Sequence, residues 1–315
     1  IVSSALFSTY STTKFLKYEI PSKTPNTHLA QIGQNQAKKL TLLSRPTLLT
    51  LYRFGGSLLL GLLLHPKYFD VAARVKETIQ VMPAFMAPAF FLFVANFANS
   101  ISLDRIGISL TYTSKCGIPL ITVLMTLLQD GRSALPSTQS LLSLIPIALG
   151  IALSSWNSPS FEPVGFIAAM ISCAAQSALN VSSKRAMSRT GLAGPQAQRA
   201  MVTVGFIITI LYSVLLLVKS QRPDLSTNAD QKQPPTWLSG MAVTAYHVEY
   251  ILSFMFVKLV APITYGACDA VRRLSIIISG RQMFGGSPFS RINKCGIAMA
   301  LLGALAYSIS STGAK

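Results

Sequence analysis

The chain has 315 residues, of which 50% are hydrophobic and only 12% are charged. Soluble domains average about 25% charged residues, so this composition excludes an ordinary soluble protein and indicates a membrane protein. The net charge of +17 comes from 27 basic and 10 acidic residues. Because most of the cations lie in polar breaks, where lipid headgroups can meet them, and no basic face with interleaved aromatic residues is present, we expect no nucleic-acid partner.

Ten apolar runs follow one another along the chain, each about long enough to cross the ~30 Å of hydrocarbon in a bilayer. They predict an all-α polytopic membrane protein with ten transmembrane helices. The predicted spans are 1–20, 47–64, 80–103, 107–128, 138–156, 163–187, 200–218, 236–257, 262–284 and 292–311. Because the first residue is Ile1 and not Met, we expect that upstream sequence is missing and that any targeting segment lies there.

An internal repeat is indicated by matching residues at a constant interval. Thr111 in the fourth span and Thr264 in the ninth each precede a tyrosine, and they are 153 residues apart. Gly150 in the fifth span and Gly303 in the tenth have the same separation of 153 residues. The sequence therefore predicts that the fourth and ninth spans are equivalent, as are the fifth and tenth.

The interval divides the chain into two five-helix repeats, predicted at 1–156 and 157–315. The first includes a polar loop at 21–46 and the second a polar loop at 219–235. Five spans is an odd number, so the two repeats must have opposite orientations in the bilayer. Inverted repeats are typical of transporters whose binding site lies near the midplane. The loops on the two sides contain similar numbers of Lys and Arg, which leaves the orientation open.

The residue patterns of enzymes and metal sites are absent from the sequence. It contains no nucleophile elbow, no cluster of metal ligands and no glycine loop that would hold phosphate. The four cysteines lie far apart without CxxC spacing, so neither zinc nor a disulfide framework is indicated. We therefore expect no enzymatic activity, no cofactor and no metal.

Six ionisable side chains lie inside the predicted spans, where one charge costs roughly 3 kcal/mol on insertion scales. They are Arg53, Lys115, Glu249, Asp269, Arg272 and Arg273. Asp269 precedes the two arginines by three and four residues, so it can pair with them along one helix. Alternatively, Lys115 lies in the equivalent span of the other repeat, and the three cations can converge there as an anion site, since Arg and Lys both bind phosphate.

Further polar residues in the spans also have more than one interpretation. Asn96 and Asn99 share one helix face, where they can bind either a neighbouring helix or a ligand. Arg53 lies in the first turns of its predicted span, so we expect its guanidinium to reach toward the membrane interface. His247, two residues before Glu249, is alone too little to predict proton transfer.

Several segments resemble motifs of the plastid triose-phosphate/phosphate translocators, a branch of the drug/metabolite transporter superfamily related to nucleotide-sugar transporters. The fourth-span segment from Ile108 to Lys115, ISLTYTSK, is similar to part of their TNVSLGKVAVSFTHVIKALEP region. The segment at 165–172, GFIAAMIS, is similar to their GFISAMIS. Arg272 and Arg273 lie where their ninth helix has a Lys-Arg pair. The likeness runs from the first span to the last.

This resemblance implies two inverted five-helix repeats and the exchange of phosphate for phosphorylated compounds of three, five or six carbons. The phosphate-binding lysine of the family falls on Lys115, and its Lys-Arg pair falls on Arg272 and Arg273. The family's third-helix His and Thr fall on Asn96 and Asn99.

Two acidic residues depart from the family pattern. Glu249 replaces a tyrosine of the eighth helix and Asp269 replaces an asparagine, so the expected site has one net positive charge in place of three. We therefore expect a substrate other than triose phosphate, with less negative charge or more hydroxyl or amine donors. The predicted substrate-binding residues are Lys115, Arg272, Arg273, Asn96, Asn99, Thr111, Tyr112, Glu249, Tyr250 and Asp269.

These observations predict an antiporter that exchanges an organic phosphate for inorganic phosphate by alternating access. The same fold would also suit a nucleotide-sugar/nucleoside monophosphate exchanger of the Golgi or ER. A different class is a structural membrane protein whose charges only pair with one another. The expected partners are phosphate, small phosphorylated metabolites and the lipid bilayer, and the resemblance implies the plastid inner envelope in preference to a Golgi or ER membrane.

Overall fold

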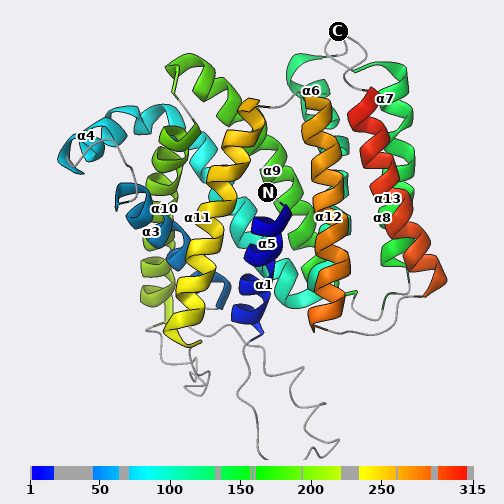
Figure 1. Cartoon of the computed structure of the whole chain (residues 1–315), viewed down its shortest axis with the longest axis horizontal. Coiled ribbons are helices and arrows are strands. Elements are labelled where there is room, and N and C mark those ends of the chain that lie inside the picture. Colours follow the sequence, from blue (N-terminus) through cyan, green and yellow to red (C-terminus); the bar gives the residue numbers. More distant parts are fainter. Residues whose placement is uncertain are drawn as a thin grey trace, which may run out of the picture.

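The computed structural model of the chain describes residues 2–17, 45–63, 71–131, 136–156, 158, 161–192, 194–220, 234–259, 262–284 and 290–310. Within these ranges the protein is built of helices and contains no strand. Most of the helices stand side by side in one bundle, while α4 lies at its periphery (Figure 1). The polar loops predicted at 21–46 and 219–235 fall almost entirely outside the described residues.

A helix occurs at the position of every predicted span, with boundaries that differ by a few residues. In chain order the helices are α1 (Val2–Leu16), α3 (Arg45–Leu63), α4 (Val71–Val81), η1 (Met82–Phe85), α5 (Met86–Ser114), η2 (Lys115–Gly117), α6 (Ile118–Asp130), α7 (Thr138–Leu142), α8 (Leu144–Ser155), α9 (Pro163–Thr190), α10 (Gly194–Ser220), α11 (Thr236–Leu259), α12 (Pro262–Phe284) and α13 (Arg291–Ser310).

Six stretches of the described chain are long and apolar enough to cross a membrane. They are Arg45–Leu63, Val75–Met125, Thr138–Ser155, Pro163–Thr190, Gly194–Leu216 and Arg291–Ser310. The helix α1, which has 15 residues, is not among them, and neither are α11 and α12, in which only part of the side chains is described. The described residues thus form a helical protein with several membrane-length segments.

The long helix α5 contains a sharp reversal at Gly107, whose φ of 74° and ψ of 179° are not helical. Along a straight helix, Ser102 and Thr111 would be about 13 Å apart at 1.5 Å per residue. Their hydroxyl oxygens instead lie 2.7 Å apart, so the chain folds back on itself between them. This turn falls where the sequence predicts the end of the third span and the start of the fourth. A positive φ of this kind is readily adopted by glycine.

Glycines allow α8 and α13 to approach until their backbones touch. A Cβ on Gly150 would lie 2.7 Å from the carbonyl oxygen of Gly296, and one on Gly303 would lie 2.9 Å from the amide nitrogen of Ile147. The absence of side chains at Gly150 and Gly303 therefore permits the close packing of these two helices. The two helices stand next to each other in Figure 1.

The centre of the bundle is formed around α1, which packs against α11 and α12 and also contacts α5 (Figure 1). The outward faces of several helices are apolar; on α10, for example, Leu211, Leu215 and Val218 are 59%, 68% and 66% exposed. Extensive exposed apolar surface marks a contact with another protein or with a membrane. The polar and charged residues described below lie inside this apolar shell.

Candidate functional site

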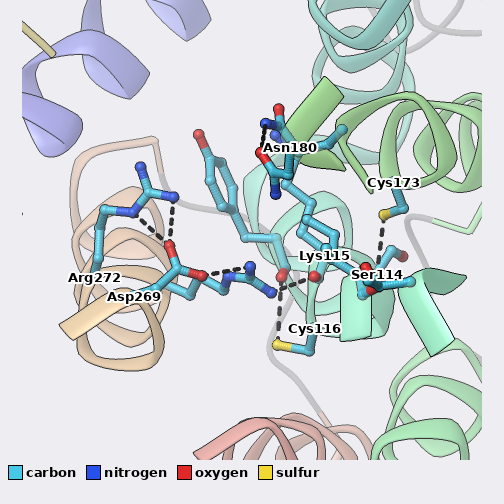
Figure 2. Close-up of polar contacts among 12 residues, drawn as sticks. Ser114, Lys115, Cys116, Cys173, Asn180, Asp269 and Arg272 are labelled. Atoms are coloured by element: carbon cyan, nitrogen blue, oxygen red, sulfur yellow. Dashed lines mark hydrogen bonds and ion pairs between the residues drawn. The ribbon is translucent and has the colours of Figure 1, made fainter. Parts of the chain in front are cut away.

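The ionisable residues of α12 form a network of ion pairs with one another and with α11. Arg272 Nη2 lies 2.6 Å from Asp269 Oδ1, and Arg273 Nη2 lies 2.5 Å from Asp269 Oδ2. Spacings of three and four residues place these side chains on one face of the helix, as the sequence predicts. From α11, Glu249 Oε1 lies 3.1 Å from Arg272 Nη1. Figure 2 shows the bonds between Arg272 and Asp269.

Arg273 connects α12 to the beginning of η2. Its side chain is 9% exposed, and its Nη1 donates a hydrogen bond to the backbone carbonyl of Lys115. The thiol of Cys116, the next residue, donates to the backbone carbonyl of Tyr112 (Figure 2). The bond from Arg273 brings together Lys115 and Arg273, which are 158 residues apart in sequence, as the anion-site interpretation requires.

Lys115 lies beside this network without a carboxylate of its own. Its ammonium is 5.2 Å from the centre of the Tyr112 ring, a cation–π distance. Within the described ranges, no carboxylate lies within ion-pair distance of Lys115 Nζ, in contrast to the two arginines of α12. In Figure 2, Asp269 and Arg272 lie on one side of Lys115, and Cys173 of α9 lies on the other.

Hydroxyl groups of α1 extend the site toward α3. The hydroxyls of Thr9 and Tyr112 are 2.8 Å apart, and Thr12 accepts a hydrogen bond from Arg53 Nη2. Neither Thr9 nor Thr12 is among the residues predicted from the sequence. The available signal was the density of hydroxyl residues in the segment STYSTTK, which is unusual for an apolar span.

The expectation that Arg53 reaches the membrane interface is wrong. Arg53 is the ninth of the 19 residues of α3 and is only 4% exposed. Its guanidinium carbon lies 5.2 Å from the centre of the Tyr246 ring of α11. The error arose because α3 begins at Arg45, so Arg53 lies near the middle of the helix and not in its first turns.

The two asparagines of α5 differ in their contacts. Asn96 Nδ2 donates to the carbonyl oxygen of Leu92 in its own helix and lies 3.2 Å from the hydroxyl of Tyr250 in α11. Asn96 thus contacts a neighbouring helix, which is one of the two roles that the sequence suggests for it, the other being contact with a ligand. Asn99 is 9% exposed, and its side-chain oxygen has no hydrogen-bond partner within the described part of the chain.

Three other predicted features are placed by the structure as well. Thr111 is fully buried with its hydroxyl at the turn of α5, next to that of Ser102. His247 has its Nδ1 2.9 Å from the hydroxyl of Ser57 on α3, whereas Glu249 faces Arg272, so the two do not form a proton-transfer pair. The side chain of Thr264, the repeat partner of Thr111, lies outside the described residues.

The arrangement is a polar, charged interior that is suited to binding an anion and contains no group of metal ligands in the described ranges. With Arg53 included, four cations face two carboxylates, which leaves two net positive charges. Two of the cations, Arg272 and Arg273, are neutralised by the protein itself. A phosphoryl group has oxygen acceptors that could take over from those carboxylates, because Arg binds phosphate and carboxylate with the same planar fork.

Comparison with known proteins gives a consistent set of relatives. A family model described as "Triose-phosphate Transporter family" matches residues 30–308. Phosphoenolpyruvate/phosphate translocator 2, chloroplastic, of Arabidopsis thaliana is 26% identical over 273 residues, which are 84% of this chain and 69% of that protein. Glucose-6-phosphate/phosphate translocator 1, chloroplastic, of the same plant is 27% identical over 222 residues, or 68% of this chain and 55% of the relative.

A rice relative gives a similar result. Phosphoenolpyruvate/phosphate translocator 3, chloroplastic, of Oryza sativa subsp. japonica is 30% identical over 218 residues, or 67% of this chain and 53% of its own length. The chain therefore spans between 53% and 69% of the length of these three relatives.

Proposed function

This chain belongs to the Triose-phosphate Transporter family, and we propose that it exchanges an organic phosphate for inorganic phosphate across a membrane. The relatives are named as phosphate translocators for phosphoenolpyruvate or glucose 6-phosphate. They are also named as chloroplastic, and we extend the plastid membrane to this chain as part of the proposal.

The observation that best supports phosphate binding is the meeting of Lys115 with the two arginines of α12. Arg273 donates a hydrogen bond to the backbone carbonyl of Lys115, and Arg272 directly precedes Arg273 on α12. A doubly charged phosphoryl group placed there would meet one ammonium and two guanidinium groups, each a strong donor to phosphate oxygens. In this proposal Lys115, Arg272 and Arg273 bind the phosphoryl group common to both substrates.

The remaining predicted residues would surround the organic part of the substrate. Asn96 and Tyr250 contact each other between α5 and α11, and Tyr112 lies between Lys115 and α1. Glu249 and Asp269 would hold the arginines when phosphate is absent. Thr111 would not contact the substrate but would stabilise the turn of α5 through its hydrogen bond with Ser102.

We further propose that the site lies between two inverted repeats, at 1–156 and 157–315, and that transport occurs by alternating access. The packing of the helices supports this division. If each predicted span is equivalent to the span five further on, the pairs α8–α13 and α3–α10 map onto themselves, and α5–α9 maps onto α11–α1. A two-fold axis in the membrane plane generates such reciprocal contacts.

The first prediction tests the phosphate site with Lys115→Gln. The purified protein is reconstituted in vesicles loaded with phosphate, and uptake of labelled phosphate is measured. Because a charge-assisted hydrogen bond contributes about 1.5–3 kcal/mol, we expect the exchange rate at low phosphate to fall roughly 10- to 100-fold. Lys294→Gln, which removes the charge of an exposed lysine on α13, is the matched control and should leave exchange unchanged.

The result also separates this proposal from the alternatives. Unchanged exchange in a folded Lys115→Gln protein would assign the charges a purely structural role. If the wild-type protein exchanges nucleoside monophosphates but not phosphate, the exchange partner proposed here is wrong.

A further inference from the structure

Arg53 is a buried cation whose charge the protein leaves without a carboxylate. It is 4% exposed, and no ion pair to it occurs in the described ranges. Its Nη2 donates to the hydroxyl of Thr12, and its guanidinium lies over the ring of Tyr246. Its Nε is buried without any hydrogen-bond partner among the described residues. Most of the donor capacity of this side chain is therefore unused.

Such an arrangement is unfavourable unless something else supplies negative charge. Arginine stays protonated in proteins and offers five N–H donors. Buried charges are normally paired, because the loss of hydration is not recovered by one neutral hydroxyl and one aromatic ring. The other buried arginines follow this rule: Arg273 pairs with Asp269, and Arg199, which is 8% exposed, pairs with Glu77. Arg53 is the exception within the described part of the chain.

Arg53 also belongs to the same polar interior as the phosphate-binding residues proposed above. The guanidinium of Arg53 lies over the ring of Tyr246, and the centre of that ring is 4.5 Å from the ring centre of Tyr250, one of the predicted substrate-binding residues. On α1, Thr9 contacts Tyr112 and Thr12 contacts Arg53. These two threonines are three residues apart and so lie on one helix face.

Lys115 and Arg53 are thus connected to the same face of α1. Lys115 lies beside Tyr112, whose hydroxyl contacts Thr9, and Arg53 donates to Thr12 three residues further along that helix. Both cations lack a carboxylate partner in the described residues, whereas Arg272 and Arg273 between α11 and α12 have theirs. Two such cations at separate positions fit a ligand with two anionic groups.

We propose that Arg53 binds a second anionic group of the transported compound, so the organic substrate carries a carboxylate or a second phosphoryl group in addition to the phosphoryl group at Lys115. This inference rests on the proposed function and specifies its substrate class. It replaces the expectation of a less negative substrate, because the buried Arg53 raises the net charge of the site from one to two. The unused donors of Arg53 would pair with that second anionic group. Inorganic phosphate has no second anionic group, so its binding would depend less on Arg53.

The experiment compares three-carbon substrates in phosphate-loaded vesicles. The panel contains inorganic phosphate, dihydroxyacetone phosphate, 3-phosphoglycerate and a three-carbon bisphosphate. For the wild-type protein, we expect 3-phosphoglycerate or the bisphosphate to be taken up with a kcat/KM roughly 10-fold or more above that of dihydroxyacetone phosphate. The better of the two identifies the second anion as a carboxylate or a phosphoryl group.

Arg53→Gln should lower the kcat/KM for the substrate with two anionic groups at least about 10-fold more than it lowers the kcat/KM for phosphate self-exchange. Arg53→Lys keeps the charge but loses the planar fork, and it should retain part of the preference. Arg105→Gln is the control, since it removes an arginine that is paired with Glu162 at a partly exposed position. Ligand-dependent shifts in Tm, measured in detergent, report binding even where a variant transports poorly.

The outcomes distinguish this inference from the proposed function. If the wild-type protein exchanges phosphate but does not prefer substrates with two anionic groups, the role given to Arg53 is wrong and the phosphate exchanger stands. The role is also wrong if Arg53→Gln keeps the preference, or if it weakens the binding of phosphate and of 3-phosphoglycerate equally. If the wild-type protein exchanges no phosphate at all, the proposed function itself fails.

Discussion

Asp269 holds two guanidinium groups with one carboxylate, one through each of its oxygens. The side chain is 18% exposed, so water screens these ion pairs only in part. In the absence of substrate, Asp269 therefore both stabilises α12 and occupies the donors that phosphate would use. The same residue should then affect stability and affinity in opposite directions.

We accordingly predict that Asp269→Asn lowers the stability of the protein measured without phosphate and increases the rise in Tm that added phosphate causes. Removing one partner of a fully buried ion pair costs about 3–5 kcal/mol, so at this partial exposure we expect roughly 1–3 kcal/mol and a Tm lower by several degrees. Added phosphate should raise the Tm of the variant more than that of the wild type, because the arginines are released for binding.

Thermal unfolding in detergent, with and without phosphate, measures both effects. Glu162→Gln breaks the partly exposed pair with Arg105 and serves as the control; such pairs contribute about 0–1 kcal/mol. A smaller phosphate-induced shift in Asp269→Asn than in the wild type would contradict the idea that Asp269 competes with phosphate.

The sequence allowed Lys115, Arg272 and Arg273 to be selected because a charge inside an apolar run is costly and needs a reason. The i,i+3 and i,i+4 pairing of Asp269 also followed from helix geometry. The position of Arg53 could not be predicted in this way. Its environment is set by Thr12 on α1 and Tyr246 on α11, and contacts between helices distant in sequence are not encoded in the composition of one helix.

At the scale of the helices, the α8–α13 contact depends on the absence of side chains at its glycines. We predict that Gly150→Ala destabilises the protein, because the added Cβ would lie 2.7 Å from the Gly296 carbonyl oxygen and 2.8 Å from the Ala300 Cα. Both are backbone atoms, so the helices would have to separate. Overpacking of this kind costs about 1–3 kcal/mol, which thermal unfolding would detect.

Gly240→Ala on α11 is the matched control for this substitution. A Cβ there meets no atom within 4 Å, and alanine is favoured over glycine in a helix by roughly 0.5–1 kcal/mol. The control should leave the Tm unchanged or raise it. Equal effects of the two substitutions would show that the α8–α13 approach is not tight.

The positions of the helices could be predicted from the sequence because runs of apolar residues have membrane length. Their ends were less predictable: α1 has 15 residues where a span of 1–20 was expected. The reversal at Gly107 was anticipated only as a gap between two spans. Its sharpness depends on the positive φ of one glycine and on the contact between Ser102 and Thr111, which periodicity does not reveal.

At the scale of the whole protein, the ion pairs of α12 bear on how strictly the two substrates are coupled. A transporter whose empty site holds unneutralised cations would return slowly without substrate. Here Glu249 and Asp269 neutralise Arg272 and Arg273. We therefore expect phosphate-loaded vesicles to take up labelled phosphate faster than empty ones, while the empty ones still show measurable uptake.

Glu249→Gln should make this coupling stricter. It removes one of the two carboxylates from Arg272, so the substrate-free change of conformation must occur with one more uncompensated charge. We expect the ratio of exchange to uptake into empty vesicles to rise about tenfold, which corresponds to about 1.4 kcal/mol on the barrier. A ratio that is unchanged or lower, with exchange itself intact, would refute this account of coupling.

Arg272 reaches two helices at once, because Asp269 belongs to α12 and Glu249 to α11. Within the described residues, α11 and α12 have few other contacts with each other, and α1 packs against both. A phosphoryl oxygen that takes the Nη1 hydrogen now donated to Glu249 would displace Glu249 and break this ion pair between α11 and α12. Binding of the substrate would then itself decide whether α11 and α12 are joined by this ion pair. No other part of the protein would be needed to couple binding to a movement of these helices.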